Sequence, residues 1–195
     1  MMPTEICLPK PLNLIAGKWV PAASGDEMDV RSPLDGEVFT TIAAAQPNDV
    51  DAAVMAAREA FDTGAWGQLT AAERGRLMLK FSLRILEEAE SLAQLESRDN
   101  GKPLKQARAD MAACARYFEF YGGAADKVHG EVIPFMKGYN VQVTREPYGV
   151  IACIIPWNYP SQMFARALAP ALAIGNSTVL KPAEDACLTC LRLAE

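Results

Sequence analysis

The sequence of 195 residues contains a single histidine, His129. A Ser-His-Asp triad or a histidine-rich metal site therefore has almost no material from which to be built. No apolar run reaches the length of about 18 residues that suggests a membrane span, and Arg166 interrupts the Ala-rich segment. The first residues lack a positive region followed by an apolar core, so the sequence predicts no secretory signal and, by default, a cytoplasmic protein.

The five cysteines are odd in number and irregularly spaced, which argues against a disulfide framework. Cys187 and Cys190 have the spacing of a redox or metal pair, but no second ligand pair accompanies them and His129 is far away in the sequence. The alternative is that they are two small residues one turn apart on a helix. The formal net charge of −5 gives no signal for nucleic acid or for an acidic membrane surface. The sequence therefore predicts neither of these partners.

Extended segments are predicted in three places. Residues 13–20 have the pattern of a hairpin, and residues 28–44 form a second extended stretch with a turn of its own. Residues 130–135 and 139–146 form two further short strands. A two-stranded ribbon is barely stable alone, so we expect this last pair to associate with strands from elsewhere, such as another subunit.

Three helical segments with apolar stripes lie between these strands. Asn48 is predicted to cap the first helix. A capping box of Thr70 and Glu73 begins the second, which is predicted to continue to the Asp-Asn-Gly-Lys-Pro sequence at 99–103. The third helix is predicted to end at the two glycines 122–123. The stripes expected to face the core are Val50, Val54, Ala57 and Phe61, then Leu77, Phe81, Ile85 and Leu92, then Leu104, Ala107, Met111, Cys114, Phe118 and Tyr121.

Residues 148–184 have the pattern of a βαβ unit, with short apolar runs on either side of an Ala-rich helix. Both strands appear apolar enough to be buried on two faces, as in parallel sheets. Ligands of such sheets bind beyond the carboxyl ends of the strands. Trp157 and Asn158 follow the first strand, and Lys181 and Glu184 follow the second, so the sequence predicts that they face one crevice.

The turn after the first strand lacks the G-x-G-x-x-G of a typical dinucleotide site and reads Pro-Trp-Asn-Tyr-Pro at 156–160. Two interpretations of Asn158 remain open. It is a helix N-cap with Pro160 in the first turn, or its carboxamide donates to an oxygen that becomes negative during a reaction.

Two interpretations also remain open for Lys181 and Glu184. They form a solvated pair at a strand end, or they bind a nucleotide ribose, whose two hydroxyl groups a carboxylate accepts well. A 2′-phosphate would be repelled by Glu184, so the second interpretation favours NAD over NADP.

Several motifs taken together resemble the aldehyde dehydrogenase superfamily. They are IAGKWV, SPLDGEV, ERGRLML, DNGKP, IIPWNYP and STVLKPAE, in the order that this family uses, from about Leu14 to Glu195. The resemblance implies an α/β fold, with N-terminal helices, the start of a Rossmann-like parallel sheet and a small oligomerisation β-ribbon, incomplete as given. It also implies three parts. Residues 1–129 are helices and hairpins of the cofactor-binding domain, residues 130–147 are the ribbon, and residues 148–195 are a truncated first βαβ unit of the NAD-binding domain. The catalytic domain is expected to be absent.

The implied reaction is oxidation of an aldehyde to a carboxylic acid with NAD(P), by a homodimer or homotetramer. A thiolate attacks the aldehyde, hydride leaves for the nicotinamide, and a glutamate activates water to hydrolyse the thioester. In this resemblance Asn158 binds the oxyanion, and Asp99 matches a position linked to a structural monovalent cation. The residues matching the cofactor site are Ile154, Ile155, Pro156, Trp157 and Asn158, followed by Lys181, Pro182, Ala183 and Glu184.

The sequence also departs from the family pattern. Many relatives carry a lysine for proton relay where this chain has Ala167, and the neighbouring Arg166 would replace it poorly because its guanidinium stays charged. None of the five cysteines matches the nucleophile, and the general-base glutamate and glycine-rich loop are also absent. We therefore expect the chain alone to be inactive. The alternatives are a non-catalytic nucleotide-binding or association module, and a sister acyl-reductase of the same superfamily.

Overall fold

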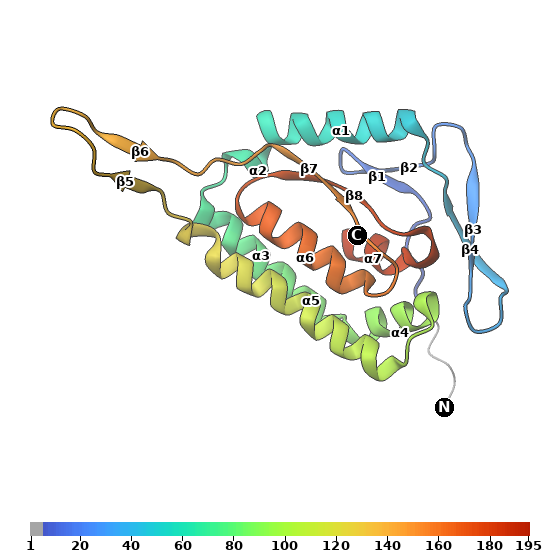
Figure 1. The fold of residues 1–195 in the computed structure, drawn as a ribbon. Helices are drawn as coiled ribbons and strands as arrows, with labels where there is room; N and C mark the ends of the chain where they lie inside the picture. The colour runs from blue at the N-terminus through green and yellow to red at the C-terminus, as the bar shows by residue number, and fades with distance from the viewer. Residues whose placement is uncertain (1–5) are drawn as a thin grey trace.

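The computed structural model describes residues 6–195 (Figure 1). Residues 1–5 lie outside this range. They are part of the N-terminal segment from which the sequence predicted no secretory signal. The α-helices are α1 (Pro47–Asp62), α2 (Ala65–Gln68), α3 (Ala71–Glu87), α4 (Ala89–Asn100), α5 (Leu104–Ala124), α6 (Pro160–Ala173) and α7 (Leu188–Ala194), with short 3₁₀ turns η1 (Ala125–Lys127) and η2 (Glu184–Ala186). The strands are β1 (Asn13–Ile15), β2 (Lys18–Val20), β3 (Glu27–Arg31), β4 (Val38–Ala43), β5 (Glu131–Ile133), β6 (Val141–Val143), β7 (Val150–Ile154) and β8 (Ser177–Lys181).

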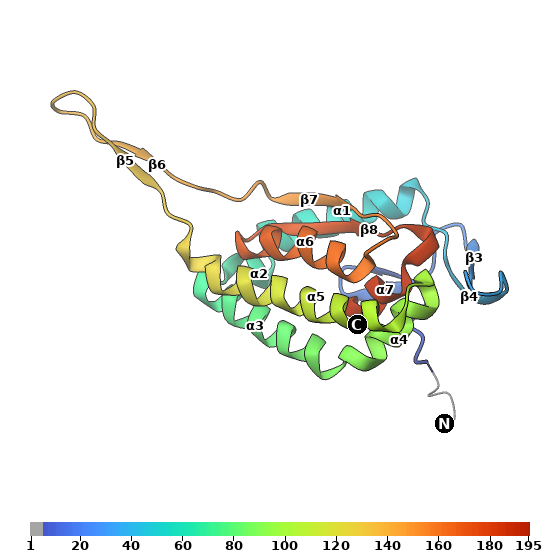
Figure 2. The ribbon, with the colours of Figure 1, turned by 60° about the horizontal axis from the view of Figure 1, so that its bottom comes forward.

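Three antiparallel hairpins form where extended segments were predicted: β1 with β2, β3 with β4, and β5 with β6. In the first, Ala16 and Gly17 both have positive φ, as a tight two-residue hairpin turn requires. The β5–β6 hairpin projects away from the rest of the chain, and both views show this (Figures 1 and 2). Its strands are shorter than predicted, and Val132 is 73% exposed. Its pairing with another chain stays a prediction.

The predicted βαβ unit is confirmed. β7 and β8 pair in parallel, and α6 makes the crossover between them. α6 packs on one face of this pair and α1 on the other (Figure 2). The expectation that both strands are buried on two faces is wrong for β7, because Ile154 is 81% exposed while the neighbouring Cys153 and Ile155 are buried. At the carboxyl end of β7, no described element covers the face on which Ile154 lies.

The main core lies between α3, α5 and α6, which pack side by side (Figure 1). The stripe of α5 is buried from Ala107 to Phe118 and half-buried at its ends, Leu104 and Tyr121. Phe118 meets Phe81 edge to face with ring centroids 4.7 Å apart. The stripe of α1 is partly wrong, since Val50 and Val54 are 51% and 43% exposed. α1 contacts both β7 and β8, and Ala57 is the member of its stripe that is fully buried.

Three helix boundaries differ from the predictions. Gln46, not Asn48, precedes α1, and it forms the capping box with Asp49. The second predicted helix is two helices, α3 and α4, which meet at Glu88 where the backbone leaves helical angles. The capping box of Thr70 and Glu73 is confirmed at the start of α3.

The third predicted helix, α5, passes through both glycines and ends at Ala124. Gly122 does not end the helix but lets α5 pack closely against α3. A Cβ on Gly75 of α3 would lie 2.4 Å from the carbonyl oxygen of Gly122, so the two backbones nearly touch at this crossing. The pair of glycines therefore sets the distance between α3 and α5.

We predict that Gly75→Ala lowers the free energy of unfolding by about 1–3 kcal/mol, because the added methyl group forces α3 and α5 apart. The matched control is Gly123→Ala, where a Cβ would meet no atom within 4 Å. This control is expected to be neutral or to stabilise by up to about 1 kcal/mol through helix propensity. Urea unfolding of both variants measures the difference, and equal effects at the two positions would contradict the packing role.

Candidate active site at the carboxyl ends of β7 and β8

The carboxyl ends of β7 and β8 lie side by side. In the parallel register Ile154 is opposite Lys181, and the N–H of Ile155 donates to the carbonyl oxygen of Lys181 at 3.1 Å. The turn that carries Asn158 and the segment that carries Glu184 therefore leave the sheet at the same edge, as the sequence predicted. This is the edge at which parallel sheets bind ligands.

Asn158 is not the N-cap of α6, so the capping interpretation is wrong. Tyr159 occupies that position with φ −138° and ψ 63°, and no side chain caps the helix there. Pro160 begins α6, as expected. Asn158 itself is exposed, and within residues 6–195 its carboxamide makes no hydrogen bond. Its two N–H donors are therefore available to a ligand.

Lys181 and Glu184 form an ion pair with an Nζ–Oε2 distance of 2.5 Å, and their side chains are 61% and 60% exposed. The hydrogen bond from Lys181 lowers the pKa of Glu184, which keeps the carboxylate ionised. Pro182 and Ala183 between them are half-buried. The pair is solvated, as the first interpretation stated, and this leaves both charged groups accessible to a ligand, as the second requires.

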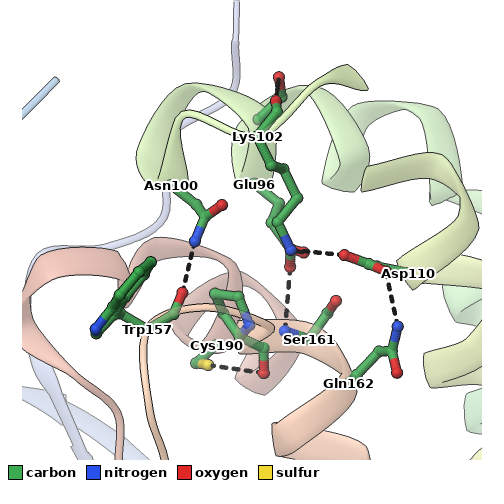
Figure 3. Close-up of polar contacts among 10 residues, drawn as sticks. Glu96, Asn100, Lys102, Asp110, Trp157, Ser161, Gln162 and Cys190 are labelled. Atoms are coloured by element: carbon green, nitrogen blue, oxygen red, sulfur yellow. Dashed lines mark hydrogen bonds and ion pairs between the residues drawn. The ribbon is translucent and has the colours of Figure 1, made fainter. Parts of the chain in front are cut away.

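An ion triad is buried next to the turn that carries Asn158 (Figure 3). The sequence analysis did not predict it. Lys102 Nζ lies 2.8 Å from Glu96 Oε1 and 2.6 Å from Asp110 Oδ2, and each of these three side chains is at most 7% exposed. Burial opposes the charge on Lys102, but its hydrogen bonds to Asp110 and Glu96 outweigh this and raise its pKa. Burial raises the pKa of Glu96, and the contact with Lys102 opposes that rise.

The carboxylate oxygens that Lys102 leaves free bind the start of α6. Glu96 Oε2 accepts from the N–H of Ser161 at 3.1 Å, and Asp110 Oδ1 accepts from Gln162 Nε2 at 2.7 Å. A carboxylate at a helix N-terminus satisfies free N–H groups and complements the helix dipole. Glu96 therefore supplies from α4 the cap that α6 lacks in its own sequence.

One sequence signal could have revealed the triad. Glu96 and Asp99 follow Leu92 at helical spacings of four and seven, on the face that the sequence assigned to the core. Acidic residues on a buried stripe require a cation or hydrogen-bond donors. Lys102, within the DNGKP motif, is the nearest lysine in the sequence.

Asp99 is 1% exposed, and its Oδ2 accepts from the N–H of Leu188, the first residue of α7, at 2.9 Å. Its Oδ1 is buried without a hydrogen-bond partner among the described residues. Burial, with a smaller contribution from Glu96, raises the pKa of Asp99 to about 7. That free oxygen fits one ligand of a cation, although residues 6–195 contain no group of three acidic, thiol or imidazole side chains that could hold a metal ion. A structural monovalent cation at Asp99 stays a prediction.

The cysteines are all free thiols, and four of them are buried. Burial raises the pKa of Cys187 to about 12 and also raises that of Cys190 well above its ordinary value, so neither carries an accessible thiolate. Cys114 and Cys153 are likewise buried with raised pKa. The pair at 187 and 190 packs into the core at the start of α7, which supports the interpretation as small core residues.

Comparison with known proteins decides the family. The sequence matches the family model described as the aldehyde dehydrogenase family over residues 19–195. This chain belongs to the aldehyde dehydrogenase family. A crystal structure assigned as an aldehyde dehydrogenase from Burkholderia cenocepacia superposes with a TM-score of 0.92 at 55% identity, covering 94% of this chain and 38% of that one.

Other members of the family give the same picture. The structure of PnpE in complex with nicotinamide adenine dinucleotide has a TM-score of 0.91 at 48% identity, over 94% of this chain and 38% of its own. The mitochondrial aldehyde dehydrogenase family 2 member B4 of Arabidopsis thaliana is 46% identical over 177 residues, which are 90% of this chain and 33% of that protein. This chain thus spans between a third and two fifths of the length of these relatives. In its described residues, no helix is both long enough and apolar enough to cross a membrane.

We predict that Asp99→Asn flattens the pH dependence of folding stability. Because its pKa is raised from 3.8 to about 7, the folded protein keeps the Asp99 proton after the unfolded chain has lost it. The stability that this carboxyl contributes at low pH is therefore lost as the pH rises from about 4 towards 7, by at most roughly 4 kcal/mol. The asparagine oxygen can still accept from Leu188.

Urea unfolding between about pH 5 and pH 8, in buffers without alkali-metal ions, tests this prediction. Asp185→Asn, at an exposed carboxylate, serves as the control and should keep the slope of stability against pH that the unsubstituted protein shows. An unchanged slope in Asp99→Asn would show that another group titrates.

Proposed function

We propose that this chain forms the cofactor-side part of the active site of an NAD-dependent aldehyde dehydrogenase, which oxidises an aldehyde to a carboxylic acid. The observation that carries the proposal is the register of β7 and β8, which brings the Asn158 turn and the Lys181–Glu184 pair to one sheet edge. Family membership supports it, as do the relatives whose structures contain nicotinamide adenine dinucleotide, among them betaine aldehyde dehydrogenase of Staphylococcus aureus.

In this proposal Asn158 directs its carboxamide N–H groups at the aldehyde oxygen as that oxygen becomes negative. A donor that is already oriented needs no reorganisation during the reaction, which is why such groups have large effects on rate. The donors of Asn158 are unpaired within the described chain, and hydrogen bonds to Trp157 and Ser161 hold the backbone of its turn, which supports this role. NAD, when bound at this edge, would supply the acceptor for the hydride.

Lys181 and Glu184 are proposed to bind the adenosine ribose of NAD. Glu184 is ionised and accessible, so its oxygens can accept from the two ribose hydroxyls, and Lys181 adds a donor. The other residues of the proposed cofactor site are Ile154, Ile155, Pro156 and Trp157 on the β7 side, and Pro182 and Ala183 on the β8 side. Ile155 is buried, so its exposed neighbours provide the contact surface on the β7 side.

The nucleophilic thiolate and the general base are proposed to come from outside residues 6–195. Four of the five thiols are buried with raised pKa, which makes them poor nucleophiles. The second candidate function, a non-catalytic nucleotide-binding or association module, rests on this same observation. Aldehyde-dependent NADH formation by the 195-residue chain alone would exclude the module and also our expectation that the chain alone is inactive.

The remaining organisation is likewise proposed. Residues 1–129 and 148–195 belong to the cofactor-binding domain, and residues 130–147 form an oligomerisation ribbon for a homodimer or homotetramer. The exposed, unpaired edges of the projecting ribbon support this role. We also propose a cytoplasmic location. The names of several relatives specify mitochondria, so the compartment has to be tested for this protein.

We predict that Asn158→Ala, in the active enzyme that contains this chain, lowers kcat by roughly one to three orders of magnitude, because one oxyanion donor is lost. The control is Asn48→Ala, at an exposed asparagine in the first turn of α1. Steady-state oxidation of an aliphatic aldehyde, followed by NADH absorbance, measures both variants. An unchanged kcat in Asn158→Ala would remove the oxyanion role.

We predict that Glu184→Ser raises the preference for NADP over NAD by roughly tenfold or more, because a like-charge contact with the 2′-phosphate is removed. Asp185→Ser is the control, since it removes the adjacent exposed carboxylate without changing the proposed ribose contact. The ratio of kcat/KM values for the two cofactors is the measurement. If both variants shift the ratio equally, net charge and not a ribose contact sets the preference.

A further inference from the structure

The turn that carries Asn158 is attached to the body of the protein on both sides of that residue (Figure 3). Asn100 Nδ2 donates to the carbonyl oxygen of Trp157 at 2.6 Å, and Glu96 Oε2 accepts from the N–H of Ser161 at 3.1 Å. Both attachments come from the C-terminal half of α4. Asn158 lies between them with its own carboxamide unpaired in the described chain.

The residues that separate Asn158 from Ser161 are held as well. Lys102 Nζ lies 4.7 Å from the centre of the Tyr159 ring, and the Cys190 thiol donates to the carbonyl oxygen of Pro160 at 3.7 Å. From 157 to 161, Asn158 is therefore the residue that makes none of these contacts itself.

Among these contacts, the one made by Asn100 acts most directly on Asn158. The carbonyl group of Trp157 and the N–H of Asn158 belong to one planar peptide unit. A hydrogen bond that fixes the direction of this carbonyl also fixes the plane from which the Cα–Cβ bond of Asn158 leaves. Rotation of that plane would swing the carboxamide away from its target.

Asn100 is in turn supported by a rigid part of the chain. It is the last residue of α4, and Gly101 ends the helix with φ 79°, a left-handed conformation that glycine adopts without strain. On one side Asp99 binds the N-terminus of α7, and on the other Lys102 is fixed in the ion triad. The DNGKP motif thus places Asn100 between two buried anchors.

We propose that Asn100 is a positioning residue for the oxyanion donor, and that it acts by orienting the peptide plane that precedes Asn158. This inference rests on the proposed role of Asn158 in aldehyde oxidation. It assigns to the polar end of α4 a part in catalysis without contact with the substrate.

The test is a double-mutant cycle in the active enzyme that contains this chain. We expect Asn100→Ala to lower kcat/KM for the aldehyde about tenfold, as for a modest misplacement of a catalytic group. In an Asn158→Ala background the same change should lower it by less than about twofold, because the group that Asn100 orients is already gone. The control is Gln94→Ala, which removes another amide from α4; within residues 6–195 the side chain of Gln94 bonds Glu90, and kcat/KM should stay unchanged.

The outcomes separate the two hypotheses. Full multiplication of the two losses would overturn the positioning role, because Asn100 would then act independently of Asn158, as a purely structural residue does. No loss in Asn100→Ala would overturn it too. If Asn158→Ala itself loses no activity while the unsubstituted enzyme oxidises aldehydes, the oxyanion role fails instead.

A second variant and a second measurement cover the case in which Asn100→Ala is too unstable to assay. Asn100→Asp keeps the size of the side chain but cannot donate to the Trp157 carbonyl when ionised, so we expect a similar loss. A crystal structure of either variant should show the peptide plane between Trp157 and Asn158 rotated from its direction in the unsubstituted protein, and that of Gln94→Ala should not. Full activity in Asn100→Asp, or an unchanged peptide plane in both Asn100 variants, would overturn the proposal.

Discussion

The buried contact of Lys102 with Glu96 and Asp110 is the interaction on which the arrangement of the site depends. The two carboxylates come from different helices, α4 and α5, and the ammonium between them is nearly excluded from water. Removing one partner of such a group leaves an uncompensated buried charge, which typically costs about 3–5 kcal/mol. α4 and α5 are therefore locked in one relative position, and α6 is placed against both of them.

Stability alone does not explain why this position is ionic. Well-packed apolar residues of similar volume often replace a buried ion pair without loss of stability. An apolar cluster, however, would not offer directed acceptors to the start of α6. The remaining oxygens of Glu96 and Asp110 bind Ser161 and Gln162, and α6 has no side-chain cap of its own. An apolar cluster would only pack against α6. The carboxylates of the triad also specify where α6 begins and how the turn before it is oriented.

How much the sequence revealed follows from which interactions are local. The βαβ unit and the shared sheet edge were predictable because apolar runs and strand polarity are written in neighbouring residues. The capping box at Thr70 was predictable for the same reason. The end of α5 was not, since Gly122 contacts Gly75 across a helix crossing 47 residues away in the chain, and a glycine pair in isolation indicates a helix end.

The candidate site divides in the same way. Asn158, Lys181 and Glu184 were found because they follow strands and match a family motif. The residues that hold the turn were missed, because a glutamate or an asparagine in a helix usually faces solvent. Their roles depend on contacts that are distant in the sequence, 57 residues from Asn100 to Trp157 in the turn and 65 from Glu96 to Ser161 in α6. Pattern reasoning identified the groups proposed for the chemistry, whereas their support became visible only when the helices were placed in space.

The two ends of the sheet edge are built differently, and the difference fits the roles proposed for them. A ribose-binding pair contributes to affinity, and side chains that are exposed and mobile can rearrange when the ligand arrives, as Lys181 and Glu184 can. An oxyanion donor acts only if its dipole is oriented before charge develops, since reorientation during the reaction would consume the stabilisation it provides. Rigidity is therefore required at the end of β7 and not at the end of β8. The buried triad and the attachments from α4 hold the backbone at the first of these ends, so that the carboxamide of Asn158 leaves the chain from a fixed position.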